Sequence, residues 1–121
     1  MTEHLFVYGT LRPGDVRWPL LESFAADDGV DDTVAGTVYD TGRGYPAAIF
    51  DGENTIIGRT YRLHDGSLLD AMATLDAEEG SVDGDFHRVP VVTNSGLAAW
   101  AYAYGSGLTL TVIPSGDWLT R

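Results

Sequence analysis

The order of apolar and polar positions predicts a chain built mostly from strands. Leu5 to Tyr8 is an apolar run rich in aromatic and branched residues, and it ends abruptly at Gly9. Further runs with strand-like alternation cover residues 33–39, 45–50, 55–63, 86–93, 97–104 and 108–113. Gly58 indicates a bend in one of them, and Pro90 places another at a sheet edge or a bulge, because proline cannot donate to a central ladder.

Apolar residues recur at helical spacing in two segments, from Pro19 to Ala26 and from Ser67 to Glu79. Gly80 is a natural stop for the second segment. About six strands and two short helices, mixed in order rather than strictly alternating, favour an α+β domain. At 121 residues with 44% hydrophobic content, the chain is expected to form a single domain over residues 1–121.

The strand expected over residues 97–104 separates small from bulky side chains. One face carries Ala99, Ala101 and Ala103, and the other carries Trp100, Tyr102 and Tyr104. Such a division suits a tightly curved sheet wrapped around a filled interior. We therefore expect a small mixed β-barrel that is partly closed, with Trp118 packing down as a lid after the last strand.

The charge of the chain argues against two classes of partner. It has 18 acidic residues against 7 basic ones, all of them arginine, and a net charge of −11. Nucleic acids and anionic membrane surfaces are poor partners for such a field, so we expect neither. The acid excess also suggests the hypothesis of adaptation to a salt-rich cytoplasm; folding and activity that do not change in molar salt would contradict it.

The chain has no cysteine, which excludes disulfides, thiolate metal sites and a cysteine nucleophile. No apolar run is long enough to span a bilayer, and the first residues lack the regions of a signal peptide, so we expect a soluble protein of the cytoplasm. The histidines at 4, 64 and 87 lack metal-ligand spacing. The aspartates at 27, 28, 31 and 32 are interpreted as a solvated loop, so no metal site is expected.

The segment after the first strand has the composition of an anion-binding loop. Gly9 and Gly14 allow the backbone to turn so that several amide groups point at one ligand, a carboxylate or a phosphate. The pattern that holds a nucleotide phosphate, with a lysine after the second glycine, is missing. Arg12 has two interpretations: it holds an anionic group of a substrate, or it pairs with an acid on the surface.

A carboxylate ends the apolar stripe of the second helical segment. At about 100° per residue, one narrow face carries Leu68, Met72, Leu75 and Glu79. The helix C-terminus, the neighbouring acids and partial burial would raise the pKa of Glu79, which suits a group that takes and returns a proton near neutral pH. The alternative is that Glu79 lies in a frayed last turn and faces solvent.

The chain resembles the gamma-glutamylcyclotransferase-like group, in its small AIG2-like branch, through two motifs. They are Tyr8-Gly9-Thr10-Leu11-Arg12-Pro13-Gly14 and Leu75-Asp76-Ala77-Glu78-Glu79-Gly80. Supporting matches are Gly44-Tyr45-Pro46-Ala47, Ile57-Gly58-Arg59-Thr60-Tyr61-Arg62-Leu63 and Ala99-Trp100-Ala101-Tyr102-Ala103-Tyr104. The resemblance covers nearly the whole chain in the expected order, and it implies the gamma-glutamylcyclotransferase-like fold and release of 5-oxoproline from gamma-glutamyl compounds.

Carried over by position, the resemblance implies a site made of two parts. The substrate-binding part would consist of Tyr8, Gly9, Thr10, Leu11 and Arg12. Glu79 would be the catalytic acid and base. The substrate would be a small gamma-glutamyl amine or peptide, and no metal or organic cofactor is implied.

Phe86 departs from the family pattern, since many members carry a tyrosine at this position. The missing hydroxyl removes a hydrogen bond that a substrate could receive. Tyr45 or Tyr104 would supply a replacement contact, or these aromatic rings belong to the core. Besides the enzyme, two functions stay open: a ligand-binding or regulatory domain that has kept the pocket without turnover, and a structural interaction module.

Overall fold

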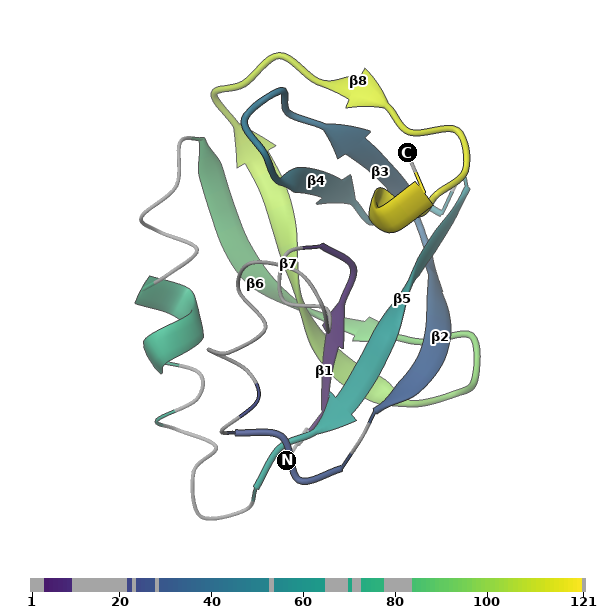
Figure 1. Ribbon diagram of the computed structural model, residues 1–121, viewed down its shortest axis with the longest axis vertical. Coiled ribbons are helices and arrows are strands. Elements are labelled where there is room, and N and C mark those ends of the chain that lie inside the picture. The colour runs from purple at the N-terminus through teal and green to yellow at the C-terminus, as the bar shows by residue number, and fades with distance from the viewer. Residues whose placement is uncertain are drawn as a thin grey trace.

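The computed structural model describes residues 4–9, 22, 24–27, 29–52, 54–64, 70, 73–77 and 84–120 (Figure 1). The strands are β1 (His4–Val7), β2 (Val30–Ala35), β3 (Thr37–Asp40), β4 (Pro46–Ile49), β5 (Thr55–Arg62), β6 (Asp85–Val92), β7 (Ala98–Ser106) and β8 (Thr111–Val112). Residues 70 and 73–77 are helical, and a 3-10 helix, η2, spans Trp118–Thr120. The molecule is therefore a strand-rich α+β fold with few helices, as expected.

The strands form two sheets that bring the ends of distant segments together. The larger sheet has the order β2-β5-β1-β7-β6, and the smaller one has the order β4-β3-β8. Neighbouring strands are antiparallel except β1 and β7, which run parallel with Leu5 opposite Trp100. Because β7 is parallel to β1 and antiparallel to β6, the C-terminal ends of β1 and β7 and the N-terminal end of β6 lie at the same end of the larger sheet.

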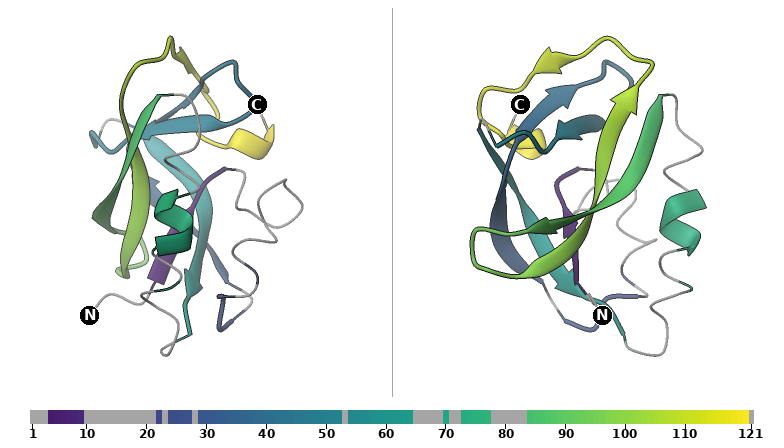
Figure 2. Two further views of the ribbon diagram at one scale, coloured as in Figure 1. Left: turned by 90° about the vertical axis from the view of Figure 1, so that its left-hand side faces the viewer. Right: turned by 180° about the vertical axis from the view of Figure 1, so that it is seen from behind.

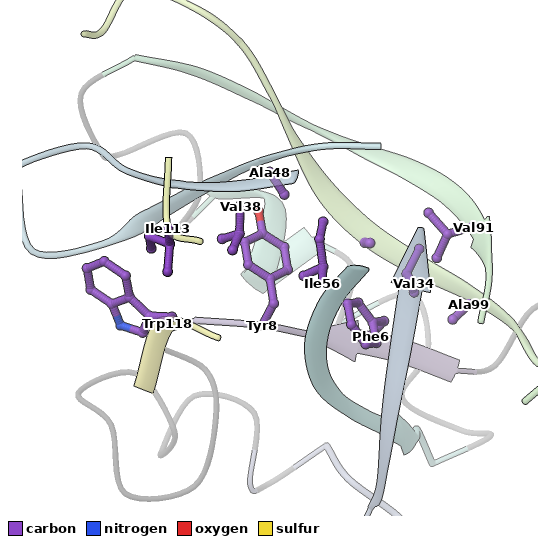
Figure 3. Packing of buried hydrophobic residues seen from close by; sticks show 11 residues of the cluster. Phe6, Tyr8, Val34, Val38, Ala48, Ile56, Val91, Ala99, Ile113 and Trp118 are labelled. Carbon is purple, nitrogen blue, oxygen red and sulfur yellow. The ribbon is translucent and has the colours of Figure 1, made fainter. Parts of the chain in front are cut away.

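Apolar side chains cover both faces of the larger sheet. The cluster on one face consists of Leu5, Val7, Tyr61, Leu63, Leu75 and Tyr102. Leu75 is fully buried, so the helical segment 73–77 packs on this face, beside β6 (Figure 2). The cluster between the two sheets includes Phe6, Tyr8, Val34, Val38, Ala48, Ile56, Val91, Ala99, Ala101, Ile113 and Trp118 (Figure 3).

The sheets do not close, so the expectation of a partly closed barrel is not supported. The strand expected over residues 33–39 breaks at Gly36 into β2 and β3, which belong to different sheets. A Cβ atom at Gly36 would lie 2.7 Å from the carbonyl oxygen of Ile49 and 2.8 Å from Cδ1 of Ile56, so the chain crosses here at close quarters. The smaller sheet therefore forms a second layer against the larger one. Eight strands are described, where about six were expected.

Several local predictions are confirmed. The segments around Asn94 form the antiparallel hairpin β6–β7, and Pro90 lies in β6, an edge strand of the larger sheet. Trp118 is 2% exposed and packs into the cluster between the sheets. The first predicted helix ends earlier than expected, because Ala25 instead makes a bridge to Leu63 at the end of β5.

The tip of the β6–β7 hairpin is tied to β2, the opposite edge strand of the larger sheet. The amide of Asn94 donates to the carbonyl of Thr33 at 2.8 Å. The hydroxyl of Ser95 donates to Oδ2 of Asp32, and the amide of Thr33 donates to Oδ1 of the same carboxylate at 2.8 Å. Burial raises the pKa of Asp32, but these bonds and one from Thr93 outweigh it and lower that pKa from its usual value.

We expect Asp32→Ala to lower the free energy of unfolding by about 2 kcal/mol at pH 7, because it removes charge-assisted hydrogen bonds from a buried site. Since folding lowers the pKa, the carboxylate stabilises the fold fully above about pH 4, and this contribution is lost as the pH falls through the folded-state value. Urea unfolding of the wild-type protein and the variant, at pH 7 and at a pH below about 4, measures this contribution to the free energy of unfolding. Asp31→Ala is the control, because Asp31 makes an ion pair with Arg59 while its side chain is 82% exposed, and it should cost less than about 1 kcal/mol. Equal losses in the two variants at pH 7 would refute the assignment.

Candidate functional site

The end of β1 lies against the start of β4 through Gly9. A Cβ atom at Gly9 would lie 2.5 Å from Cγ and 2.8 Å from Cδ of Pro46, so only a residue without a side chain fits this approach. Gly9 is buried. The loop that the sequence predicts as anion-binding therefore begins beside Pro46 and its chain neighbour Tyr45.

Three aromatic residues predicted for the site lie in one cluster. The ring centroids of Tyr45 and Phe86 are 6.0 Å apart, and those of Phe86 and Tyr104 are 5.6 Å apart, both in edge-to-face geometry. Phe86 and Tyr104 are register partners on β6 and β7, and each of the three rings is half-buried. The structure thus brings Tyr45, Phe86 and Tyr104 together from separate segments of the sequence, and Gly9 lies against Pro46, the chain neighbour of Tyr45.

The hydroxyl groups of Tyr8, which directly follows β1, and of Tyr104 in β7 bond to the main chain. Tyr8 donates to the carbonyl of Tyr102 at 2.5 Å in a buried hydrogen bond. Tyr104 donates to the carbonyl of Leu108 at 3.1 Å and accepts from the amide of Leu108 at 2.8 Å. Each phenol has one proton, so in this structure both donors are already used for bonds within the protein.

A pocket of about 310 Å³ opens between the β6–β7 hairpin and the helical segment 73–77. It is lined by Asp76, Phe86, His87, Arg88 and Tyr102. Phe86 belongs both to this pocket and to the aromatic cluster, so the two features adjoin. Its ring presents an apolar edge where a tyrosine would present a hydroxyl.

A polar network crosses this pocket. The hydroxyl of Tyr102 donates to Oδ1 of Asp76 at 2.6 Å, and Nη2 of Arg88 lies 3.5 Å from Oδ2 of Asp76. The guanidinium carbon of Arg88 lies 4.9 Å from the ring centroid of Trp100. The network joins the helical segment to both strands of the hairpin, through one hydrogen bond and one ion pair on the same carboxylate.

Sequence reasoning found one part of this arrangement and missed another. Thr10, Leu11, Arg12 and Glu79 lie outside the described residues, so their predicted roles remain predictions. Asp76, Arg88 and Tyr102 were not predicted as site residues. Asp76 does lie in the motif that ends at Gly80, but it is not one of the residues on the narrow face that carries Leu75 and Glu79.

Two observations concern described residues outside the candidate site. In the part of the chain that the structure describes, no helix has the length and apolarity needed to cross a membrane. Of the aspartates interpreted as a solvated loop, Asp27 accepts from the amides of Gly29 and Arg62, and Asp31 pairs with Arg59. Together with the Asp32 bonds, these contacts give the described members of that group a structural use.

Comparison with known proteins gives a consistent family match. The sequence profile described as "Gamma-glutamyl cyclotransferase, AIG2-like" matches residues 5–120. A protein of Halalkalibacterium halodurans, described as a putative gamma-glutamylcyclotransferase, is 33% identical over 89 residues, which cover 71% of this chain and 80% of that protein.

Solved structures resemble the fold. The crystal structure of the uncharacterized protein PH0828 from Pyrococcus horikoshii superposes with a TM-score of 0.74 at 22% identity, covering 97% of this chain and 90% of that one. An AIG2-like protein from Mus musculus has a TM-score of 0.62 at 16% identity, covering 86% of this chain and 76% of that one. At these identities the likeness shows the fold alone.

Proposed function

Because this chain belongs to the AIG2-like gamma-glutamyl cyclotransferase family, we propose that it cyclises the gamma-glutamyl group of a small gamma-glutamyl amine or peptide to 5-oxoproline and releases the amine. In this proposal the loop that starts at Gly9 binds the substrate, and Glu79 carries out the proton transfers. Tyr45, Phe86 and Tyr104 form the aromatic wall of the same site.

One observation carries the proposal: β1 is followed by Gly9, which lies against Pro46, the chain neighbour of Tyr45 in the aromatic cluster. Gly9 contacts Pro46, and the adjacent Tyr45 contacts Phe86, which in turn contacts Tyr104. The start of a loop suited to a carboxylate thus lies next to a partly apolar wall suited to a glutamyl chain. Loop ends carried by a rigid sheet are where small domains usually place binding chemistry.

In the proposed reaction, the α-amine of the substrate attacks its own γ-carbonyl carbon. Glu79, as a carboxylate, takes the proton that the amine loses, and the new C–N bond closes the ring. The C–N bond to the leaving amine then breaks, and Glu79 returns the proton to the leaving nitrogen. Because both reacting groups belong to one molecule, holding the substrate folded supplies much of the acceleration.

The test is to incubate the protein with a panel of gamma-glutamyl amines and peptides and to measure 5-oxoproline. We expect 5-oxoproline and free amine in equal amounts from at least one member of the panel. Saturable binding without any release would instead favour the ligand-binding alternative, which the phenylalanine at position 86 and the bonded hydroxyl groups of Tyr8 and Tyr104 would then explain.

We expect Phe86→Tyr to raise kcat/KM by about fivefold, because a hydroxyl at the edge of the pocket would add one hydrogen bond of about 1 kcal/mol to the bound substrate. Steady-state kinetics on the best substrate of the panel measure this effect. Tyr39→Phe, which removes a phenol hydroxyl from β3 in the smaller sheet, is the control and should leave kcat/KM unchanged. Unchanged kcat/KM in Phe86→Tyr would mean that this position contacts the substrate through its ring alone.

A further inference from the structure

We propose that Tyr102 is a positioning residue that ties the strand leading into the loop to the helical segment leading to Glu79. The inference rests on the proposed function, because it concerns how the two parts of that site are held relative to each other. Tyr102 lies in β7 and is 5% exposed. Its main-chain carbonyl bonds to Tyr8, beside the start of the loop, and its phenol hydroxyl bonds to Asp76 in the helical segment.

The hydrogen bond to the main-chain carbonyl of Tyr102 holds the residue that precedes the loop. The hydroxyl of Tyr8 donates to the carbonyl of Tyr102 at 2.5 Å, across a sequence separation of 94 residues and out of contact with water. Tyr8 directly precedes Gly9, where the loop begins. A buried hydrogen bond is directional, so it sets the position of the last side chain before the loop relative to β7.

The phenol contact fixes the helix side. The hydroxyl of Tyr102 donates to Oδ1 of Asp76 at 2.6 Å, a short bond to a charged acceptor. Arg88, the register partner of Tyr102 on β6, holds the other oxygen of that carboxylate at 3.5 Å. Arg88 is itself held over the ring of Trp100. Asp76 is therefore bound from both strands of the hairpin.

Glu79 follows Asp76 by three positions in the sequence, so the chain between their Cα atoms reaches at most about 10 Å. Leu75 already anchors the helical segment in the core, where it is fully buried. Apolar packing is non-directional, however, and does not by itself fix the rotation of the segment about its axis. The hydrogen bond from Tyr102 supplies that direction.

The test is Tyr102→Phe, which removes the phenol hydroxyl and keeps both the ring and the main-chain carbonyl. We expect kcat for 5-oxoproline release to fall by about 10- to 100-fold, since a misplacement of about 1 Å has effects of this size. KM should change by less than about threefold, because the bond from Tyr8 persists. Tyr8→Phe should do the reverse and raise KM more than it lowers kcat. Tyr39→Phe, on β3, is the matched control and should leave both constants unchanged.

Hydrogen exchange of the peptide that spans residues 70–80 tests the tether independently of turnover. We expect faster exchange in Tyr102→Phe than in Tyr39→Phe. Equal exchange in the two variants, or a kcat of Tyr102→Phe within about twofold of the control, would overturn the positioning role while leaving the proposed function intact. Absence of 5-oxoproline from the wild-type protein would count against the proposed function, and the exchange result would still decide whether the tether exists.

Discussion

Replacement of Glu79 by glutamine is expected to lower the rate of 5-oxoproline release by at least about 100-fold, because an amide cannot take the proton of the attacking amine or return it to the leaving one. KM should change little, since glutamine keeps the size and the hydrogen-bonding oxygen of the side chain. Initial rates on the best gamma-glutamyl substrate measure the effect.

Glu78→Gln is the matched control for this variant. It removes one negative charge from the same motif, one position earlier, and should retain kcat within about threefold because no proton passes through that residue. A Glu79→Gln variant that kept the wild-type rate would remove Glu79 from the chemistry. The family membership of the chain would stand, but another group would have to move the proton.

Gly58→Ala is expected to destabilise the fold by about 3 kcal/mol, at the upper end of the cost of overpacking a core. A Cβ atom at this position would collide with the carbonyl oxygen of Val7 and would lie 2.6 Å from Cζ of Phe6. The first of these is backbone and cannot turn away. The midpoint of thermal unfolding should fall by roughly 10 °C, as measured by circular dichroism or calorimetry.

The comparison for Gly58→Ala is Gly52→Ala. Gly52 has a positive φ of 80° but nothing within 4 Å of the position of a Cβ atom, so its replacement costs only the strain of the left-handed conformation, about 1 kcal/mol. If Gly58→Ala cost no more than Gly52→Ala, the close approach of β5 to β1 would not be what requires glycine at residue 58.

The sequence pattern predicted most of the described strands but not how they are arranged. Strand alternation located the β6–β7 hairpin and the edge position of Pro90, since both follow from local chemistry. The break at Gly36 was missed, because a continuous alternating run gives no sign that its halves pair in different sheets. That choice depends on contacts with Ile49 and Ile56, which are distant in sequence. The barrel prediction failed for the same reason.

The candidate site shows a similar division. Gly9 was predicted from its freedom of backbone conformation, but the structure gives a different reason for glycine here: Gly9 is not among the glycines with a positive φ, and the close approach of Pro46 leaves no room for a side chain. Tyr102 was interpreted only as a bulky residue on one face of a strand. Its two hydrogen bonds join residues 8 and 76, and no local pattern encodes a contact between such distant positions. The roles of Thr10, Leu11, Arg12 and Glu79 rest on motif and phase, and they remain predictions.

The origin of the oxygen atoms in the product tests the central claim, intramolecular cyclisation, most directly. A gamma-glutamyl substrate is turned over in water enriched in ¹⁸O, and the products are examined by mass spectrometry. The account predicts 5-oxoproline and free amine in equal amounts with no ¹⁸O incorporated, because the nucleophile is the α-amine of the substrate. Glutamate that carries ¹⁸O, formed by attack of water on the same carbonyl, would contradict it.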